Sequence, residues 1–317
     1  MPFLKPRRLR EGDLVGLVNL SSVATDEHVE RAVRNLAAQG FRVKPGRHLR
    51  AVHGHYAGTV EQRVEDLHAM FDDREVRAIW CLRGGAGCAN LLPRIDFARI
   101  RRNPKIVVGF SDVTALLLAI WRKARLVTFH GPVGTTLVSD FNVARARALL
   151  MQPGTETVLP ISAESLQLAA TEPQYTPRVF REGAASGRLA GGNLSIVSSL
   201  VGTPWGITEP GALLFLEEIG EEPYRIDRML TQLAQSGMLA RSAGFALGTF
   251  RDCEAKPGEP SFTLAQALEG QFAPRKQPSM YGLSIGHIPR QLTLPVGVRA
   301  RLDTRERTIT LLETAVT

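Results

Sequence analysis

The sequence predicts an α/β protein with two domains. The first is expected to hold a doubly wound, flavodoxin-like parallel sheet, and the second, smaller α/β domain a mixed sheet. Three observations support this fold class. Apolar strands alternate with amphipathic helices in the first half of the chain. Residues 76–82 and 105–110 are nearly continuous apolar runs, typical of strands buried on both faces. Residues 296–303 and 307–313 alternate apolar with polar side chains, as in an antiparallel hairpin exposed on one face.

Strands and helices of the first half can be assigned in order. Residues 13–20 predict a strand, and residues 26–40 predict a helix whose apolar side chains repeat at helical spacing. Thr59 and Gln62 match a capping box, so a helix is expected to begin there. A further helix over residues 112–124 follows the apolar run 105–110 directly. This β-α-β-α order favours a parallel sheet covered by helices.

A change of pattern separates the two halves. Residues 151–183 contain four prolines and no sustained helical spacing, so we expect a linker there. The predicted domains are therefore residues 1–150 and residues 184–317. In the second domain, residues 212–218 and 245–250 are expected to be strands, and a helix is expected between them.

Composition excludes several classes of protein. The chain has 317 residues, of which 44% are hydrophobic and 22% charged, as in ordinary globular proteins. No apolar run approaches the roughly 20 residues that span a bilayer, and the first ten residues lack the apolar stretch of a signal peptide. We therefore expect a cytoplasmic protein without a membrane partner. The net charge of +8 is carried by scattered arginines, and aromatics make up only 6%, so no nucleic-acid partner is expected.

Cysteine usage argues against disulfides and metal centres. The three cysteines, Cys81, Cys88 and Cys253, form no CxxC pair. We expect them to be reduced thiols that pack as small apolar residues. No metal or other cofactor is predicted.

Ser111 is the first candidate for chemistry. It lies between the apolar run 105–110 and the following helix, at the carboxyl end of a predicted parallel strand, where open α/β sheets bind ligands. With Gly109 two residues earlier, the turn resembles the nucleophile elbow G-x-S-x-G, although the second glycine is missing. The alternative is that Ser111 only caps the helix.

A serine nucleophile needs a base and a group that orients the base. His287 follows a short apolar strand and a glycine and is the candidate base. Glu217 and Glu218 end a predicted strand and point to opposite faces, so strand alternation does not decide which one would contact a histidine. Residues 81–87, CLRGGAG, are glycine-rich. Their backbone N–H groups are expected either to bind an anion, such as an oxyanion or a phosphate, or simply to form a tight turn.

Taken together, these stretches resemble the LD-carboxypeptidase family of serine peptidases, which includes the microcin C self-immunity peptidases. The resemblance extends over nearly the whole chain and rests on the order and spacing of six stretches: residues 54–97, 103–120, 126–132, 187–205, 213–233 and 281–297.

The resemblance implies a catalytic triad of Ser111, Glu217 and His287, and so it selects Glu217 over Glu218. It also implies an oxyanion hole formed by the backbone N–H groups of Gly85 and Asp112. Since Ser111 belongs to the first domain and the other two triad members to the second, we expect the site where the domains meet.

The implied substrate is a peptide that ends in a D-amino acid, most simply the murein tetrapeptide, from which the terminal D-Ala is released during cell-wall recycling. Arg83 and Arg225 are candidates to bind its free carboxylate, since arginine binds carboxylates bidentately. The implied assembly is a homodimer.

Two departures from the family pattern affect the expected pocket. The first strand ends VNLSS, where VAPSS is commoner, and Ala86 stands where an aromatic residue is common. Two alternatives therefore stay open. One is a self-immunity-type peptidase that acts on peptidyl- or aminoacyl-nucleotides, and the other is a protein without catalytic activity that binds anionic ligands.

Overall fold

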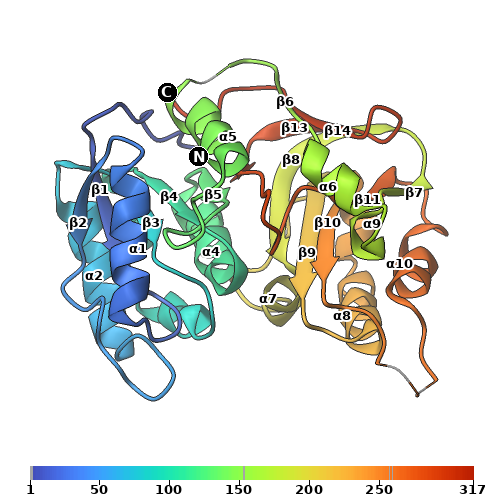
Figure 1. The fold of residues 1–317 in the computed structure, drawn as a ribbon, viewed down its shortest axis with the longest axis horizontal. Coiled ribbons are helices and arrows are strands. Elements are labelled where there is room, and N and C mark those ends of the chain that lie inside the picture. Colours follow the sequence, from blue (N-terminus) through green and yellow to red (C-terminus); the bar gives the residue numbers. More distant parts are fainter. Residues whose placement is uncertain (1–2, 153, 257, 259) are drawn as a thin grey trace. The chain divides into compact units, whose positions relative to one another are not determined.

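The structure is a computed structural model that describes residues 3–152, 154–256, 258 and 260–317. These residues form two compact units (Figure 1). The first unit contains the described residues of Met1–Gly154 together with Thr293–Gly297 and Thr314–Thr317, and the second contains those of Thr155–Leu292 and Val298–Glu313. The chain thus returns to the first unit twice near its end. The domain limits drawn from the sequence pattern, 1–150 and 184–317, remain a prediction.

A largely parallel sheet forms the centre of the first unit, with the strand order β12-β5-β4-β3-β1-β2. Only β12 at the edge is antiparallel to its neighbour. The order β2-β1-β3-β4-β5 is that of a flavodoxin-like doubly wound sheet, as predicted. The elements are β1 (Leu14–Val18), α1 (Asp26–Ala37), β2 (Arg42–Pro45), α2 (Val60–Asp72), β3 (Val76–Cys81), η1 (Cys88–Arg94), α3 (Phe97–Arg102), β4 (Ile106–Gly109), η2 (Ser111–Val113), α4 (Thr114–Ala124), β5 (Thr128–His130), α5 (Asp140–Met151) and β12 (Leu294–Val296).

Local sequence explains where the helices of this unit begin. The hydroxyl of Thr59 accepts the N–H of Gln62, and the Gln62 side chain accepts the N–H of Thr59. This is the capping box predicted from the sequence. Helix α4 is apolar on nearly all sides, and residues 113–121 are all buried. Packing therefore fixes the start of this helix and with it the short η2 turn that contains Ser111.

A mixed sheet forms the centre of the second unit, with the order β6-β14-β13-β8-β9-β10-β11-β7. Strands β8 to β11 are parallel, and the outer strands are antiparallel to their neighbours. The elements are β6 (Thr157–Leu159), α6 (Ala163–Leu168), η3 (Pro173–Tyr175), β7 (Arg178–Arg181), β8 (Ala184–Asn193), α7 (Leu194–Ser199), β9 (Leu213–Ile219), α8 (Pro223–Gln235), α9 (Met238–Arg241), β10 (Gly244–Arg251), α10 (Leu264–Phe272), β11 (Ser279–Leu283), β13 (Arg299–Asp303) and β14 (Thr308–Leu311).

The long strand β8 joins the two parts of this sheet. Its first half pairs with β13 and its second half with β9. Strands β13 and β14 form the predicted antiparallel hairpin, in which buried and more exposed residues alternate. Within residues 151–183, for which the sequence pattern predicted a linker, lie β6, α6, η3 and β7.

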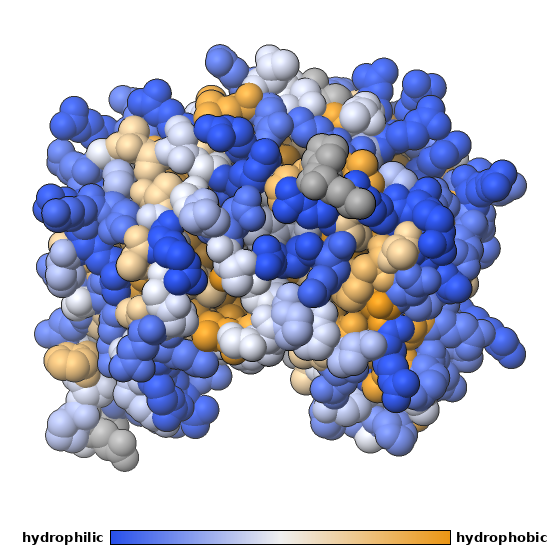
Figure 2. Space-filling view, turned by 180° about the vertical axis from the view of Figure 1, so that it is seen from behind, coloured by the Kyte–Doolittle hydropathy of each residue, from blue (hydrophilic) through white to orange (hydrophobic). Residues whose placement is uncertain are grey.

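Hydrophilic side chains cover most of the surface that Figure 2 presents, and hydrophobic ones lie between them in small groups. Among the described residues, no helix is long and apolar enough to cross a membrane. All three cysteines are free and buried, and burial raises the pKa of Cys81 to about 12.

One buried amine makes stability depend on pH. Lys105, 3% exposed, donates hydrogen bonds to the carbonyl oxygens of Asp73 and Val76. Burial lowers the pKa of Lys105 from 10.5 to about 8. Between these two values the unfolded chain holds a proton that the folded chain has released, so rising pH stabilises the folded state.

We therefore expect the stability difference between wild type and Lys105→Met to change with pH. The free energy of unfolding of the wild type should increase relative to the variant from about pH 7.5 to about pH 9.5, because only the wild type loses the cost of a buried charge. Urea unfolding at both pH values measures the difference. A wild-type free energy of unfolding that stays constant or falls relative to that of the variant as the pH rises would contradict this account.

Candidate active site

Ser111 occupies a sharp turn between β4 and α4. Its φ is +61°, in the left-handed region that non-glycine residues rarely adopt. No hydrogen bond among the described residues uses its hydroxyl, and no side-chain cap is recorded at the start of η2 or α4. The turn therefore has the strained strand-to-helix geometry of a nucleophile elbow and not that of a helix cap.

Two glycines make room for this turn. A Cβ at Gly109 would lie 2.5 Å from Cγ1 of Val113, so the strand and the helix could not approach so closely. A Cβ at Gly84 would lie 2.8 Å from Cβ and 3.0 Å from Oγ of Ser111. The structure thus brings the glycine-rich loop after β3 directly against the Ser111 side chain, as expected where parallel strands end at one edge of a sheet.

The loop at residues 84–88 contains the candidate oxyanion donor, the N–H of Gly85. The N–H of Ala86 donates to Oγ of Ser22 at 3.0 Å. Gly85 has a φ of +136°, and a Cβ there would lie 2.2 Å from the same Oγ. No hydrogen bond among the described residues uses the N–H of Gly85. The N–H of Asp112 lies in the first helical turn, where backbone donors have no intrahelical partner. Both groups are thus available to bind an oxyanion.

The side chain of Asp112 turns into the protein. It is 4% exposed, and its Oδ2 accepts the N–H of Cys88 at 2.9 Å. Burial raises the pKa of the Asp112 carboxyl, while contacts with Ser21, Cys88 and Arg63 act to lower it.

Arg63, from α2, is 1% exposed, and its charge interacts with that of the Asp112 carboxylate. Its Nη1 donates to the carbonyl oxygens of Leu20 and Gly87 at 3.0 and 3.1 Å. Sequence analysis did not single out this arginine. The available signal was its helical spacing with Leu67 and Met70, which puts all three on the buried face of α2.

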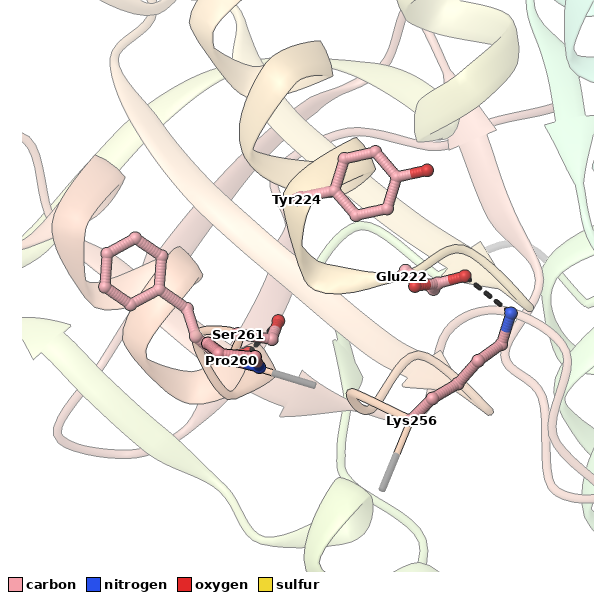
Figure 3. Close-up of a pocket in the computed structure, with 6 residues that line it drawn as sticks. Glu222, Tyr224, Lys256, Pro260 and Ser261 are labelled. Carbon is pink, nitrogen blue, oxygen red and sulfur yellow. Dashed lines mark hydrogen bonds and ion pairs between the residues drawn. The ribbon is translucent and has the colours of Figure 1, made fainter. Parts of the chain in front are cut away.

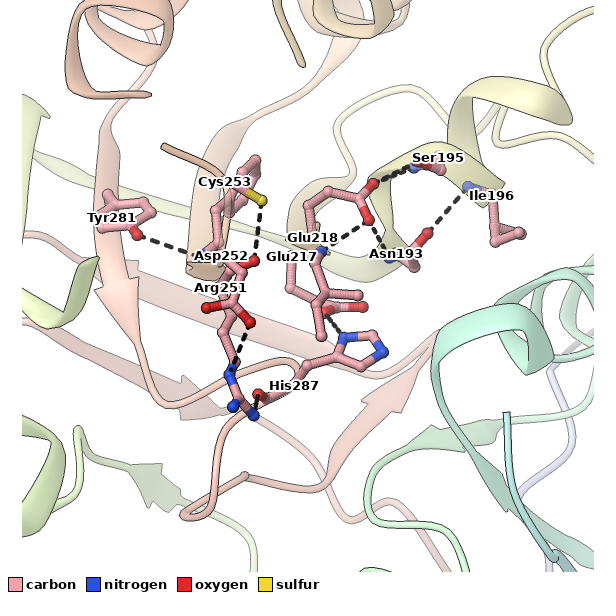
Figure 4. Close-up of polar contacts among 12 residues, drawn as sticks. Asn193, Ser195, Ile196, Glu217, Glu218, Arg251, Asp252, Cys253, Tyr281 and His287 are labelled. Carbon is pink, nitrogen blue, oxygen red and sulfur yellow. Dashed lines mark hydrogen bonds and ion pairs between the residues drawn. The ribbon is translucent and has the colours of Figure 1, made fainter. Parts of the chain in front are cut away.

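The second cluster lies at the carboxyl ends of β9 and β11. Nδ1 of His287 and Oε2 of Glu217 are 2.7 Å apart (Figure 4). Glu217 is completely buried, and its other oxygen, Oε1, has no hydrogen-bond partner among the described residues. Because a carboxylate only accepts, Nδ1 of the histidine carries the proton in this pair. Nε2 is then the nitrogen with a lone pair that can accept a proton.

The loop before His287 depends on a glycine as well. Gly286 has a φ of +110°, and a Cβ there would lie 2.7 Å from Oε2 of Glu217. Nη1 of Arg251 donates to the main-chain oxygen of His287 at 3.3 Å. The His287 loop is therefore held against the carboxylate from two sides.

Glu218 points away from the histidine. Its oxygens accept the side-chain amide of Asn193 and the N–H and hydroxyl of Ser195, at 2.7 to 2.8 Å (Figure 4). Burial raises the pKa of Glu218. The sequence pattern left Glu217 and Glu218 as alternatives, and the geometry brings only Glu217 to His287.

Both arginines proposed for substrate binding already have protein partners. Nη1 of Arg83 donates to the carbonyl oxygen of Val23 at 2.9 Å. Arg225 is half-exposed, its Nε donates to the hydroxyl oxygen of Tyr224 at 3.0 Å, and its Nη1 lies 3.6 Å from a carboxylate oxygen of Glu221. The guanidinium of Arg225 is thus accessible, whereas that of Arg83 stabilises the segment after β1 through its bond to Val23.

A surface pocket of about 500 Å³ opens in the second unit (Figure 3). Its walls combine an ion pair between Lys256 and Glu222, 2.8 Å apart, with the aromatic rings of Tyr224 and Phe262. These residues follow β9 and β10, so the pocket lies near the carboxyl ends of the strands that lead to Glu217 and Arg251. Nowhere in the described part of the chain do three His, Cys, Asp or Glu side chains gather as metal ligands.

Comparison with known proteins identifies both halves of the chain. The LD-carboxypeptidase N-terminal domain family matches residues 15–131, and the LD-carboxypeptidase C-terminal domain family matches residues 186–302. A probable murein peptide carboxypeptidase of Bacillus subtilis is 39% identical, over 96% of this chain and 93% of the relative. The murein tetrapeptide carboxypeptidase of Pseudomonas aeruginosa is 34% identical, over 92% and 94%.

Solved structures share the fold. The microcin C7 self-immunity protein MccF in its apo state superimposes with a TM-score of 0.87 at 24% identity, covering 99% of this chain and 100% of that one. A muramoyltetrapeptide carboxypeptidase from Oxalobacter formigenes gives 0.80 at 27% identity, covering 94% and 97%. The resemblance expected from the sequence is confirmed: this chain belongs to the LD-carboxypeptidase family.

Proposed function

We propose that this protein is a serine carboxypeptidase that cleaves an L,D-peptide bond and releases the terminal D-Ala of murein tetrapeptide. The observation that carries the proposal is the 2.7 Å contact between His287 and the buried Glu217. A histidine oriented by a buried acid is the device that removes a proton from a serine nucleophile. The names of the relatives from Bacillus subtilis and Pseudomonas aeruginosa supply the class of substrate.

In the proposed mechanism, Oγ of Ser111 attacks the carbonyl carbon of the scissile bond while its proton passes to Nε2 of His287. Glu217 stabilises the imidazolium that forms. The negative charge that develops on the carbonyl oxygen is bound by the N–H groups of Gly85 and Asp112. His287 then gives its proton to the leaving amine of D-Ala, and water hydrolyses the acyl-enzyme. The mechanism requires that Ser111 of one unit reach His287 of the other during turnover.

The free carboxylate of the terminal D-Ala needs a cationic partner. We propose Arg225 as the first candidate because its guanidinium is half-exposed and only weakly paired with Glu221. Arg83 is the second candidate, since one of its nitrogens is already used by Val23. We also propose a cytoplasmic homodimer, as the family resemblance implies.

The proposed reaction is tested by incubating the enzyme with a defined L,D-tetrapeptide and following the mass. Loss of one alanine is the expected result. The same peptide ending in L-Ala should stay intact, because the stereochemistry at the leaving residue is what the proposed site selects. An aminoacyl-nucleotide tests the self-immunity activity that the relationship to MccF suggests. Turnover of the nucleotide with an intact tetrapeptide would reject the murein substrate.

Substitution of Ser111 should separate catalysis from stability. Both Ser111→Ala and Ser111→Gly are expected to lose turnover by at least about a thousandfold, because the nucleophile is gone. Glycine adopts a φ of +61° without strain, so Ser111→Gly should also be more stable than Ser111→Ala by about 1 kcal/mol. Steady-state kinetics and urea unfolding give both values. Near-normal turnover in either variant would refute the nucleophile, and equal stabilities would refute the strain.

Neighbouring glutamates provide a matched pair for the orienting acid. Glu217→Gln should lower kcat by on the order of a thousandfold with little change in KM, because a neutral amide no longer selects the productive tautomer of His287. Glu218→Gln, one residue along the same strand, should lower kcat by less than about tenfold, since Glu218 contacts Asn193 and Ser195 instead. If the two variants lose kcat equally, Glu217 is not the orienting acid.

A further inference from the structure

The peptide group between Gly87 and Cys88 is held at both edges by buried charges. Its carbonyl oxygen, on Gly87, accepts Nη1 of Arg63 at 3.1 Å. Its N–H, on Cys88, donates to Oδ2 of Asp112 at 2.9 Å. The guanidinium thus meets the negative end of the peptide dipole and the carboxylate meets the positive end. Hydrogen bonds to charged groups are the stronger kind, and low exposure of both side chains strengthens them further.

This peptide ends a loop that has little stiffness of its own. Residues 84–87 read Gly-Gly-Ala-Gly, and glycine backbones rotate more freely than any other. A rotation of the peptide groups would change the direction in which the N–H of Gly85 points. Three weaker, neutral or local bonds also hold the loop. The N–H of Ala86 donates to Oγ of Ser22, the N–H of Asn90 donates to the carbonyl oxygen of Gly87 at 3.3 Å, and Nε of Arg83 donates to the carbonyl oxygen of Gly84 at 3.2 Å. The hydrogen bonds from Arg63 and to Asp112 at the Gly87–Cys88 peptide therefore limit the conformations of the whole loop.

Arg63 and Asp112 also connect the Gly87–Cys88 peptide to other segments of the proposed site. Asp112 directly follows Ser111, so its side chain joins the glycine loop to the turn that holds the nucleophile. Arg63 also donates to the carbonyl oxygen of Leu20, two residues before Ser22. The ring of Tyr56 lies 5.0 Å below its guanidinium, and a Cβ at Gly87 would lie 2.4 Å from that ring. The side chains of Tyr56, Arg63 and Asp112, from three segments, thus meet at one peptide group.

We propose that Asp112 and Arg63 are positioning residues that clamp the Gly87–Cys88 peptide and thereby aim the N–H of Gly85 at the oxyanion formed on attack by Ser111. The inference rests on the proposed serine peptidase function. It assigns to the side chain of Asp112 a role separate from that of its backbone N–H. Oxyanion donors act through fixed geometry, so a loosened loop should lower kcat and leave KM nearly unchanged.

The test compares Asp112→Ala and Asp112→Asn with a matched control, Asp66→Ala. Asp66 is also buried, at 3% exposure, and its Oδ2 accepts a backbone N–H, that of His48, at 2.9 Å. We expect Asp112→Ala to lower kcat at least about tenfold with KM unchanged. Asp112→Asn retains an acceptor oxygen and should recover most of kcat. Asp66→Ala should lose stability with little loss of kcat. A fall in kcat no larger for Asp112→Ala than for Asp66→Ala would overturn the proposal.

Amide hydrogen exchange separates this inference from the proposed function, because it needs no substrate. In Asp112→Ala the exchange of the Ala86 N–H should speed up at least about tenfold, although its acceptor Ser22 is untouched. In Asp66→Ala it should not change. Acceleration confined to Cys88 would overturn the clamp, even if the wild type hydrolyses no peptide. If Asp112→Ala does not fold, Arg63→Met removes the hydrogen bond at the other edge of the peptide. For the proposal to stand, this variant must both lower kcat and speed up exchange of the Ala86 N–H.

Discussion

Close packing of side chains against glycine backbones is the constraint on which both candidate clusters depend. The turn at Ser111 exists because Gly109 lets strand and helix meet and because Gly84 leaves space for the serine side chain. A methyl group at either position would overlap atoms that are themselves packed in a buried helix or a tight loop. Since interiors are close-packed, such an overlap could not be absorbed locally. The strain of the serine backbone is thus maintained by its surroundings.

The same constraint shapes the acid and base of the second unit. Gly286 lets the loop before His287 lie directly on the carboxylate of Glu217. Gly191, inside β8, has its missing Cβ directed at the carbonyl oxygen of Phe215 on β9, only 1.7 Å away. Any side chain there would push apart the two strands that lead to the acid. The glycines therefore fix distances between polar groups that they do not themselves contact.

Buried charges serve different purposes in the two units. Glu218 and Asp112 are both carboxylates in the interior, and burial raises the pKa of each. Glu218 accepts hydrogen bonds from Asn193, Ser195 and Ile219, and Asp112 accepts the N–H of Cys88. Their hydrogen bonds link segments that lie far apart in the sequence. Such bonds offset the free-energy cost of removing a charge from water. Glu217 differs, because one of its oxygens has no partner among the described residues. Its hydrogen bond to Nδ1 of His287 connects this carboxylate to the candidate base.

The sequence by itself determined the fold class, most strand and helix positions in the first unit, and the C-terminal hairpin. These follow from local periodicity, capping residues and apolar runs, which need no knowledge of distant contacts. It also pointed to Ser111, His287 and a strand-end glutamate as residues able to do chemistry. Strand alternation alone did not separate Glu217 from Glu218, because it names two faces without saying what each one contacts. The family resemblance selected Glu217, and the tertiary structure brings that carboxylate to His287. The burial of Arg63, the return of β12 to the first sheet and the strands within residues 155–183 likewise depend on partners remote in the chain. Long-range pairing of this kind leaves no periodic signal in any single segment, so it is decided when the sheets assemble.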